Sequence, residues 1–129
     1  MSLAQLLLLG FSIRNGAEPA RFTGEWRAEH NGTAFVVLDI EDRHGLKGRL
    51  RQGAVSVDRE GHVVAASAAP AREQQLKSIE VKRGRLLFKV RGKRGQTIAY
   101  QLITTGPGSA DLTVKDMPAE MKPIQLVRQ

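Results

Sequence analysis

The sequence predicts an all-β protein, an antiparallel up-and-down β-barrel of roughly eight to ten strands. Apolar and polar residues alternate from Phe22 to the C-terminus, as in strands that bury one face. Short turn sequences such as Asn31-Gly32 separate these segments, and no window of helical length carries a sustained apolar stripe. A sheet of this size is expected to close, because open twisted sheets rarely exceed about ten strands and closure removes exposed edges.

The first predicted strand, residues 22–29, contains the single tryptophan of the chain. Alternation places Gly24 and Trp26 on its inward face. Asn31-Gly32 then predicts a tight hairpin, because both residues tolerate a positive φ. Glycines on inward faces are typical of tight barrel corners or of space left inside.

The later predicted strands follow at short intervals. They cover residues 33–41, 46–51, 55–57, 62–67, 76–82, 85–91, 97–102, 112–114 and 124–126. In the second strand alternation directs Phe35 and Val37 outward, which makes its outer face partly apolar. Residues 65–75 are the long irregular stretch, small and polar, and are expected to form either a plain linking loop or a lid at the barrel rim.

The N-terminal residues 1–20 break the alternating pattern. Their apolar run, residues 3–11, is too short for a bilayer span of about 20 residues and has the length of a signal-peptide core. No basic residue precedes the run, so we expect either the remnant of an export signal or an N-terminal extension that packs on the barrel as a short helix or edge strand. Residues 21–129 are expected to form one barrel domain, in an exported protein of the periplasm or extracellular space.

The composition excludes some classes of function but does not identify one. The 129 residues include no cysteine, which excludes disulfides, thiol nucleophiles and cysteine-ligated metals. Lys and Arg number 20 against 13 Asp and Glu, and the formal charge of +7 favours anionic partners.

Several short motifs resemble those of small lipocalin-like (calycin) barrels, including bacterial exported ones. The resemblance spans roughly residues 22–128 and is carried by Gly24-x-Trp26, Val36-x-Leu38-x-Ile40, residues 46–50, residues 79–88 and residues 123–128. In lipocalins a Gly-x-Trp lies at the closed end of the barrel and an arginine from the last strand packs over the indole. The resemblance therefore implies that Arg128 covers Trp26. The chain departs from the family in its lack of cysteines, its short length and its lack of a C-terminal helix.

The leading functional prediction is a non-enzymatic barrel that binds a small apolar ligand or serves as an accessory interaction domain. Its interior candidates share an inward position by alternation. They are Trp26, Val36, Leu38, Ile40, Leu50, Phe88, Tyr100 and Leu102.

The alternative is a basic surface-binding module with a filled core, for an anionic cell-envelope polymer, a lipid headgroup or nucleic acid. Its candidates are expected to gather on outward faces and neighbouring turns. They are Lys47, Arg49, Arg51, Lys82, Arg83, Arg85, Lys89, Arg91, Lys93 and Arg94. Single-strand binders interleave aromatics with basic residues, and these faces carry almost none, so nucleic acid is the least favoured of the three. A solvated basic face without a partner is a further interpretation.

The three histidines, His30, His44 and His62, lie in or beside predicted turns. Counting turns along a meander places His44 and His62 at one rim and His30 at the other. A metal site could be formed at the shared rim. Its ligands would be Asp42, His44, Asp58, Glu60 and His62. Turns collect such residues for ordinary reasons, so we predict no metal and no cofactor. No catalytic motif is present in the sequence, and no enzymatic activity is expected.

Overall fold

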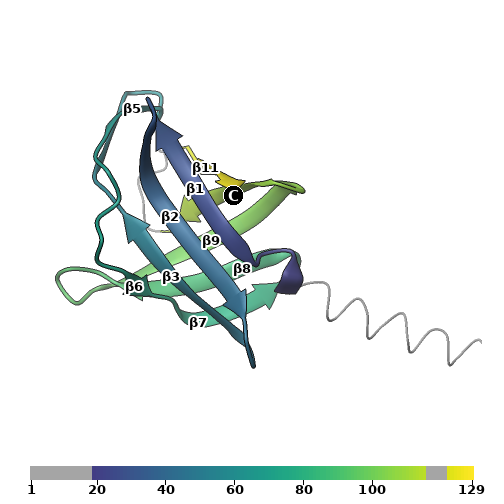
Figure 1. Cartoon of the computed structure of the whole chain (residues 1–129). Coiled ribbons are helices and arrows are strands. Elements are labelled where there is room, and N and C mark those ends of the chain that lie inside the picture. The colour runs from purple at the N-terminus through teal and green to yellow at the C-terminus, as the bar shows by residue number, and fades with distance from the viewer. Residues whose placement is uncertain (1–18, 116–121) are drawn as a thin grey trace, which may run out of the picture.

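The computed structural model describes residues 19–115 and 122–129, and within them the chain is built almost wholly of strands (Figure 1). This confirms the all-β prediction. The strands are β1 Gly24–His30, β2 Thr33–Asp42, β3 Leu46–Gln52, β4 Val55–Val57, β5 Val63–Ala66, β6 Gln74–Gln75, β7 Lys77–Lys82, β8 Arg85–Arg91, β9 Thr97–Gly106, β10 Ser109–Val114 and β11 Ile124–Arg128. Residues 1–18, to which most of the N-terminal prediction applies, lie outside the described residues.

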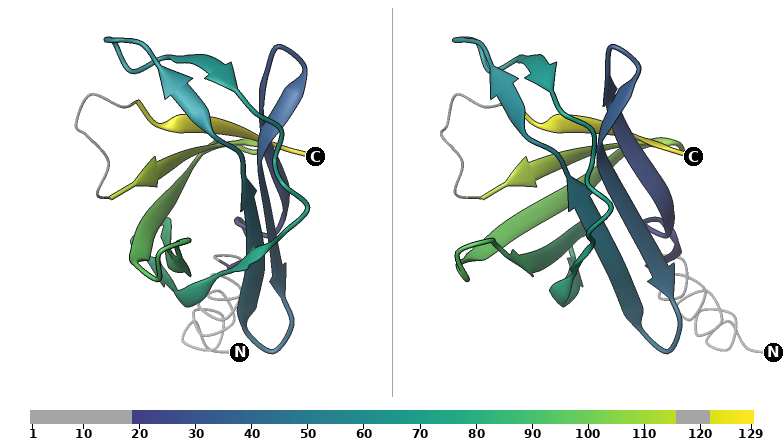
Figure 2. Two further views of the ribbon diagram at one scale, coloured as in Figure 1. Left: turned by 90° about the vertical axis from the view of Figure 1, so that its left-hand side faces the viewer. Right: turned by 60° about the vertical axis from the view of Figure 1, so that its left-hand side comes forward.

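Nine strands form one antiparallel sheet in the order β6-β3-β2-β1-β11-β10-β9-β8-β7. The last strand returns to the first, with Trp26 opposite Arg128. The sheet therefore curls into a nearly closed barrel, and Figure 2 shows its strands arranged around a ring. The remaining pair, β4 and β5, is a hairpin that follows β3 and packs Val55, Val63 and Ala66 against the core at one end of the barrel.

One stretch of chain joins the two edges of the curled sheet. β6 pairs with β3, β7 pairs with β8, and only Leu76 separates β6 from β7. The backbone N–H of Leu76 donates to the carbonyl of Gly48 at 3.0 Å, which extends the β3 pairing by one bond. The change of partner falls at a register shift in which Ser78 adopts a φ of 52°. We call residues 74–77 the seam, because there the strand leaves one neighbour for the other.

Gly48 leaves the space that the seam needs. A Cβ at this position would lie 2.6 Å from Leu76 Cδ1 and 2.7 Å from the backbone oxygen of Asp39. Both distances are shorter than real Cβ contacts, so a side chain here would force the seam or the β2 backbone to move.

The inward faces of the strands form one core. It contains Phe22, Trp26, Ala28, Phe35, Val36, Leu38, Ile40, Leu50, Leu76, Leu86, Phe88, Val90, Tyr100, Leu102, Ala110, Leu112, Ile124 and Leu126. Phe35 is a correction, since alternation directed it outward whereas it is 3% exposed and belongs to this core. The β1–β2 register shifts between Ala28 and Glu29, opposite Phe35, and such a bulge interrupts the alternation on which the prediction relied.

Trp26 closes the end of the barrel at which β1 begins. Its side chain is fully buried, and its Nε1 donates to the carbonyl of Phe22 at 3.0 Å. The guanidinium of Arg128 lies 4.5 Å from the centre of the indole ring, within the range of a cation–π contact, and also donates to the carbonyl of Arg21. The expected cover of Trp26 by Arg128 is confirmed.

Replacing Trp26 by alanine is expected to lower the free energy of unfolding by about 3–5 kcal/mol, because a large buried aromatic side chain leaves a cavity. Urea denaturation followed by circular dichroism measures this change. The control is Val127→Ala on the exposed face of β11, which should cost within about 0.5 kcal/mol. Equal midpoints for the two variants would contradict the role of Trp26 as the plug of this end.

Gly48→Ala is expected to lower the free energy of unfolding by about 1–3 kcal/mol, because the new methyl group overlaps Leu76 and the backbone of Asp39. The matched control is Gly108→Ala, whose Cβ would meet nothing within 4 Å. Thermal denaturation of both variants makes the comparison. A Gly48→Ala protein as stable as the control would show that the seam does not pack against β3 as described.

Candidate functional site

The eight predicted interior residues all project into the core. Their exposed fractions run from 0% for Trp26 to 6% for Tyr100, and they belong to one contiguous cluster. The rings of Phe88 and Tyr100 stack with centroids 5.2 Å apart and planes 7° from parallel. At these positions the side chains contact one another.

Tyr100 carries a polar group into this apolar interior. Its hydroxyl donates to Gln52 Oε1 at 2.9 Å, between β9 and β3. Burial raises the pKa of the Tyr100 hydroxyl, because the phenolate would lose its hydration. Gln52 thus faces the core on one side, and on the other it lines a surface cleft.

The cleft has a volume of about 940 Å³ and lies where the seam separates from β8. Residues 70–75 and Lys77 form one wall, and the end of β8 with the turn that follows, residues 91–95, forms the other. Its origin is topological. From Leu76 towards the N-terminus the strand pairs with β3 instead of β8, so the sheet has no ladder between β6 and the end of β8.

The charge of the cleft is strongly positive. Its lining includes four cationic side chains, Arg72, Lys77, Arg91 and Lys93, and one carboxylate, Glu73. Glu73 is already engaged, since its Oε2 lies 3.4 Å from Arg49 Nε. Within residues 19–115 and 122–129, none of the four cations lies within ion-pair distance of a carboxylate.

Arg72 and Lys77 were absent from the predicted basic surface. Arg72 precedes the seam and Lys77 ends it, and the switch of strand partner brings them beside Arg91 and Lys93. The signal in the sequence was weak. It consisted of one basic residue within, and one just after, a loop that was long enough to be a rim.

The predicted basic residues do not gather on one surface. Lys82, Arg83 and Arg85 surround the β7–β8 turn at the end closed by Trp26, whereas Lys93 and Arg94 occupy the β8–β9 turn at the opposite end. The remainder lie on the outer faces of β3 and β8. They are Lys47, Arg49, Arg51, Lys89 and Arg91.

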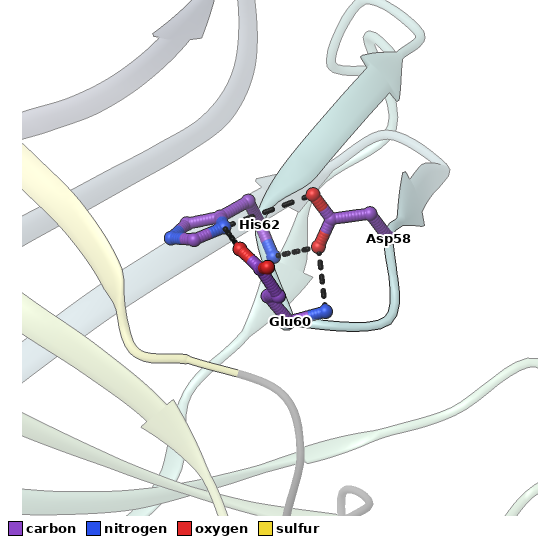
Figure 3. Close-up of side chains that lie close together, drawn as sticks. All are labelled: Asp58, Glu60 and His62. Carbon is purple, nitrogen blue, oxygen red and sulfur yellow. Dashed lines mark hydrogen bonds and ion pairs between the residues drawn. The ribbon is translucent and has the colours of Figure 1, made fainter.

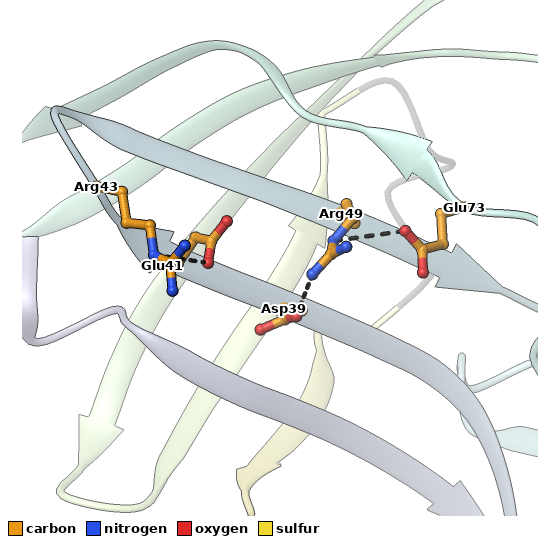
Figure 4. A network of polar contacts seen from close by, with 5 residues as sticks. All are labelled: Asp39, Glu41, Arg43, Arg49 and Glu73. Atoms are coloured by element: carbon orange, nitrogen blue, oxygen red, sulfur yellow. Dashed lines mark hydrogen bonds and ion pairs between the residues drawn. The ribbon is translucent and has the colours of Figure 1, made fainter.

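Arg49 is neutralised by its neighbours (Figure 4). Its Nη2 donates to Asp39 Oδ2 at 2.9 Å, and Glu73 lies on its other side. The hydrogen bond that Arg49 donates to Asp39, and the negative charges of Glu73 and Asp39, raise the pKa of the Arg49 guanidinium. A nearby pair joins Arg43 and Glu41 at 3.9 Å. Arg49 therefore anchors the chain just before β6 to β3.

Asp58, Glu60 and His62 meet at the tip of the β4–β5 hairpin (Figure 3). One potential ligand atom from each lies within 4.8 Å of the others, and all three residues are exposed. The arrangement has an ordinary explanation. Asp58 Oδ1 accepts the backbone N–H groups of Glu60 and His62, both at 2.9 Å, as an aspartate does when it caps a turn.

The predicted grouping of histidines at the rims is wrong. Asp42 ends β2 and His44 lies in the turn that follows, at the closed end. His62 lies at the hairpin tip beyond the opposite end, the end at which His30 completes β1. The count of turns failed because β4 continues in the direction of β3. Gly53 and Ala54 separate these strands without reversing the chain.

These features define the class of the protein as a small, nearly closed antiparallel β-barrel with a basic cleft at one end. Comparisons with protein-family models, with curated proteins and with solved structures found no match. Within the described residues, 19–115 and 122–129, no helix has the length and apolar character that crossing a bilayer would require.

The hairpin tip is expected to loosen in acid. Backbone hydrogen bonds, first that from His62, lower the pKa of Asp58 below its ordinary value of 3.8. A carboxylate with a lowered folded-state pKa contributes stability that is present above the unfolded value and lost as the pH falls through the folded value. Amide exchange at Glu60 and His62 should therefore accelerate below about pH 3.8, relative to the β1–β2 hairpin.

Asp58→Asn provides the control for this pH dependence. Its amide oxygen still accepts hydrogen bonds but has no carboxyl group to titrate. Nuclear magnetic resonance exchange rates should then change equally at the tip and in the β1–β2 hairpin over the same pH range. The same acid acceleration in Asp58→Asn as in the wild type would show that another group controls the tip.

Proposed function

We propose that this protein is a non-enzymatic binding module that holds an anionic polymer in the basic cleft beside the seam. The observation that carries the proposal is a cleft of about 940 Å³ with four cations that have no ion pair among the described residues, and whose one carboxylate already has a partner. Such a set attracts anions and costs stability through mutual repulsion when no anion is bound.

Surface electrostatics support the same ligand class. The chain carries a formal charge of +7, and long-range attraction of this sign raises the rate at which polyanions reach the protein. The basic residues on the outer faces of β3 and β8 continue away from the cleft, which suits an extended ligand better than a small one.

Among anionic polymers, a phosphate- or sulfate-bearing polymer of the cell envelope is favoured over nucleic acid. The cleft-lining residues of the described chain include no aromatic side chain on which a base could stack. Glutamines line the cleft instead, and amides donate to phosphate and sulfate oxygens as well as to sugars. Location in the periplasm or extracellular space remains a prediction, consistent with the resemblance to exported calycin-like barrels.

An apolar ligand inside the barrel is the second candidate. It is favoured by the convergence of the eight predicted interior residues and by the hydroxyl of Tyr100, which supplies a polar group within an apolar lining. It is ranked second because these side chains already contact one another. Displacement of a fluorescent fatty-acid analogue by added lipid would support it, and Leu102→Trp, which fills the interior, should abolish that signal.

The double variant Arg91→Gln, Lys93→Gln is expected to weaken binding of dextran sulfate and of polyphosphate. Each lost ionic contact removes about 0.7–0.9 of a released counterion, so the loss of two contacts should reduce the magnitude of the slope of log K against log salt concentration by about 1.5. Fluorescence anisotropy over a series of salt concentrations measures both quantities. The matched control is Lys47→Gln, Lys82→Gln, which removes the same charge from exposed positions outside the cleft lining.

Equal loss of affinity in the two double variants would refute the cleft as the binding site and leave only a diffuse basic surface. No binding of either polymer at low salt would refute the proposed function itself. Single-stranded DNA and anionic lipid vesicles serve as further ligands. The proposal requires that dextran sulfate or polyphosphate bind more tightly than both.

A further inference from the structure

The cleft lies beside one of the two shortest pairings of the barrel sheet. On one side of the seam, β6 is held to β3 by two register pairs, Arg49 with Gln75 and Leu50 with Gln74. Across the cleft, Gln74 Nε2 donates to the carbonyl of Arg91 at 2.8 Å. Within residues 19–115 and 122–129 this is the one hydrogen bond that joins β6 to β8.

Like charges also oppose closure at this place. Lys77 faces Lys89 in register across the β7–β8 pair, and both are exposed. Like charges directly opposite each other in a ladder destabilise the pairing. Arg72 and Arg91 add further positive charge on the two walls of the same cleft. Few hydrogen bonds and unbalanced charge together weaken the pairing on both sides of the seam.

We infer that a linear anion with two or more linked phosphate-type groups bridges the two walls of the cleft and locks the seam. One charged group is held by Arg72 and Lys77 on the seam wall, and another by Arg91 and Lys93 on the β8–β9 wall. The inference rests on the proposed function and adds a conformational consequence to it. A ligand that contacts both walls binds the closed seam more tightly than the open one, so its binding shifts the equilibrium towards closure.

The chemistry sets a minimum for the ligand. A single phosphate ion carries one charged group for two walls, whereas linked phosphates carry at least one group for each wall. The same linked-phosphate chemistry occurs in polyphosphate chains, in lipid headgroups that carry more than one phosphate and in nucleic-acid backbones. Short inorganic chains test the shared chemistry without the rest of any of these molecules.

Hydrogen exchange of the full chain tests the inference, with sodium tripolyphosphate and with orthophosphate at matched ionic strength. The reporters are the amides of Gln75 and Leu76, and the references are amides of the β1–β2 hairpin, where seven register pairs hold the strands. At a tripolyphosphate concentration well above its Kd, the exchange rate of the seam amides should fall by a factor of about ten or more. The references should change by less than about twofold.

Gln74→Met provides a second and independent measurement. It keeps the length of the side chain and removes the amide that joins β6 to β8, so the seam amides of the free variant should exchange faster than in the wild type. Tripolyphosphate should restore their protection, because the ligand bridges the same two walls. Gln101→Met on the outer face of β9 is the control and should leave seam exchange unchanged.

The outcomes separate the two proposals. If neither tripolyphosphate nor a longer polyanion binds, the proposed function and this inference both fail. If tripolyphosphate binds but leaves seam exchange unchanged, the site stands and the lock is wrong. Equal protection by orthophosphate would overturn the bridging of two walls. Long polyphosphate, anionic vesicles and single-stranded DNA then identify the source, since the natural partner should protect the seam at the lowest concentration.

Discussion

The barrel depends on how residues 74–82 divide their backbone hydrogen bonds between β3 and β8. A strand in a closed barrel pairs along both edges, but β6 pairs only with β3 and β7 only with β8. The division is enough to bring the two ends of the sheet together, and it removes most of the exposed edge that would otherwise invite aggregation. It also leaves an interval without a ladder, and the cleft occupies that interval.

The two ends of the barrel differ in the side chains that line them. At the closed end, Trp26 fills the interior and Arg128 covers its face, so apolar surface and a cation exclude water together. Towards the other end, the Tyr100 hydroxyl meets Gln52, and the lining changes from apolar to polar over one side chain. That change places a hydrogen-bonding surface next to the cleft without leaving a buried polar group unpaired.

Net charge alone does not show which basic residues lack an ion-pair partner among the described residues. Arg49 lies in the middle of the basic series on β3, yet Asp39 and Glu73 balance it, and its role is to hold the chain ahead of the seam. Arg72 and Lys77 carry the same charge and have no such partners among the described residues. The difference arises in part from the β2–β3 register, which places Asp39 opposite Arg49.

The sequence by itself determined the strands, most turns and the inward positions of Trp26 and Tyr100, because alternation and turn chemistry are local properties that each segment expresses alone. It also indicated the cover of Trp26 by Arg128, through resemblance to known barrels. Only the tertiary structure decided the burial of Phe35 at a bulge, the continuation of β3 into β4 that moved His62 away from His44, and the meeting of Arg72 and Lys77 with Arg91 and Lys93. Each of these depends on which strand pairs with which, and that choice is made between residues distant in the chain, where local periodicity carries no information.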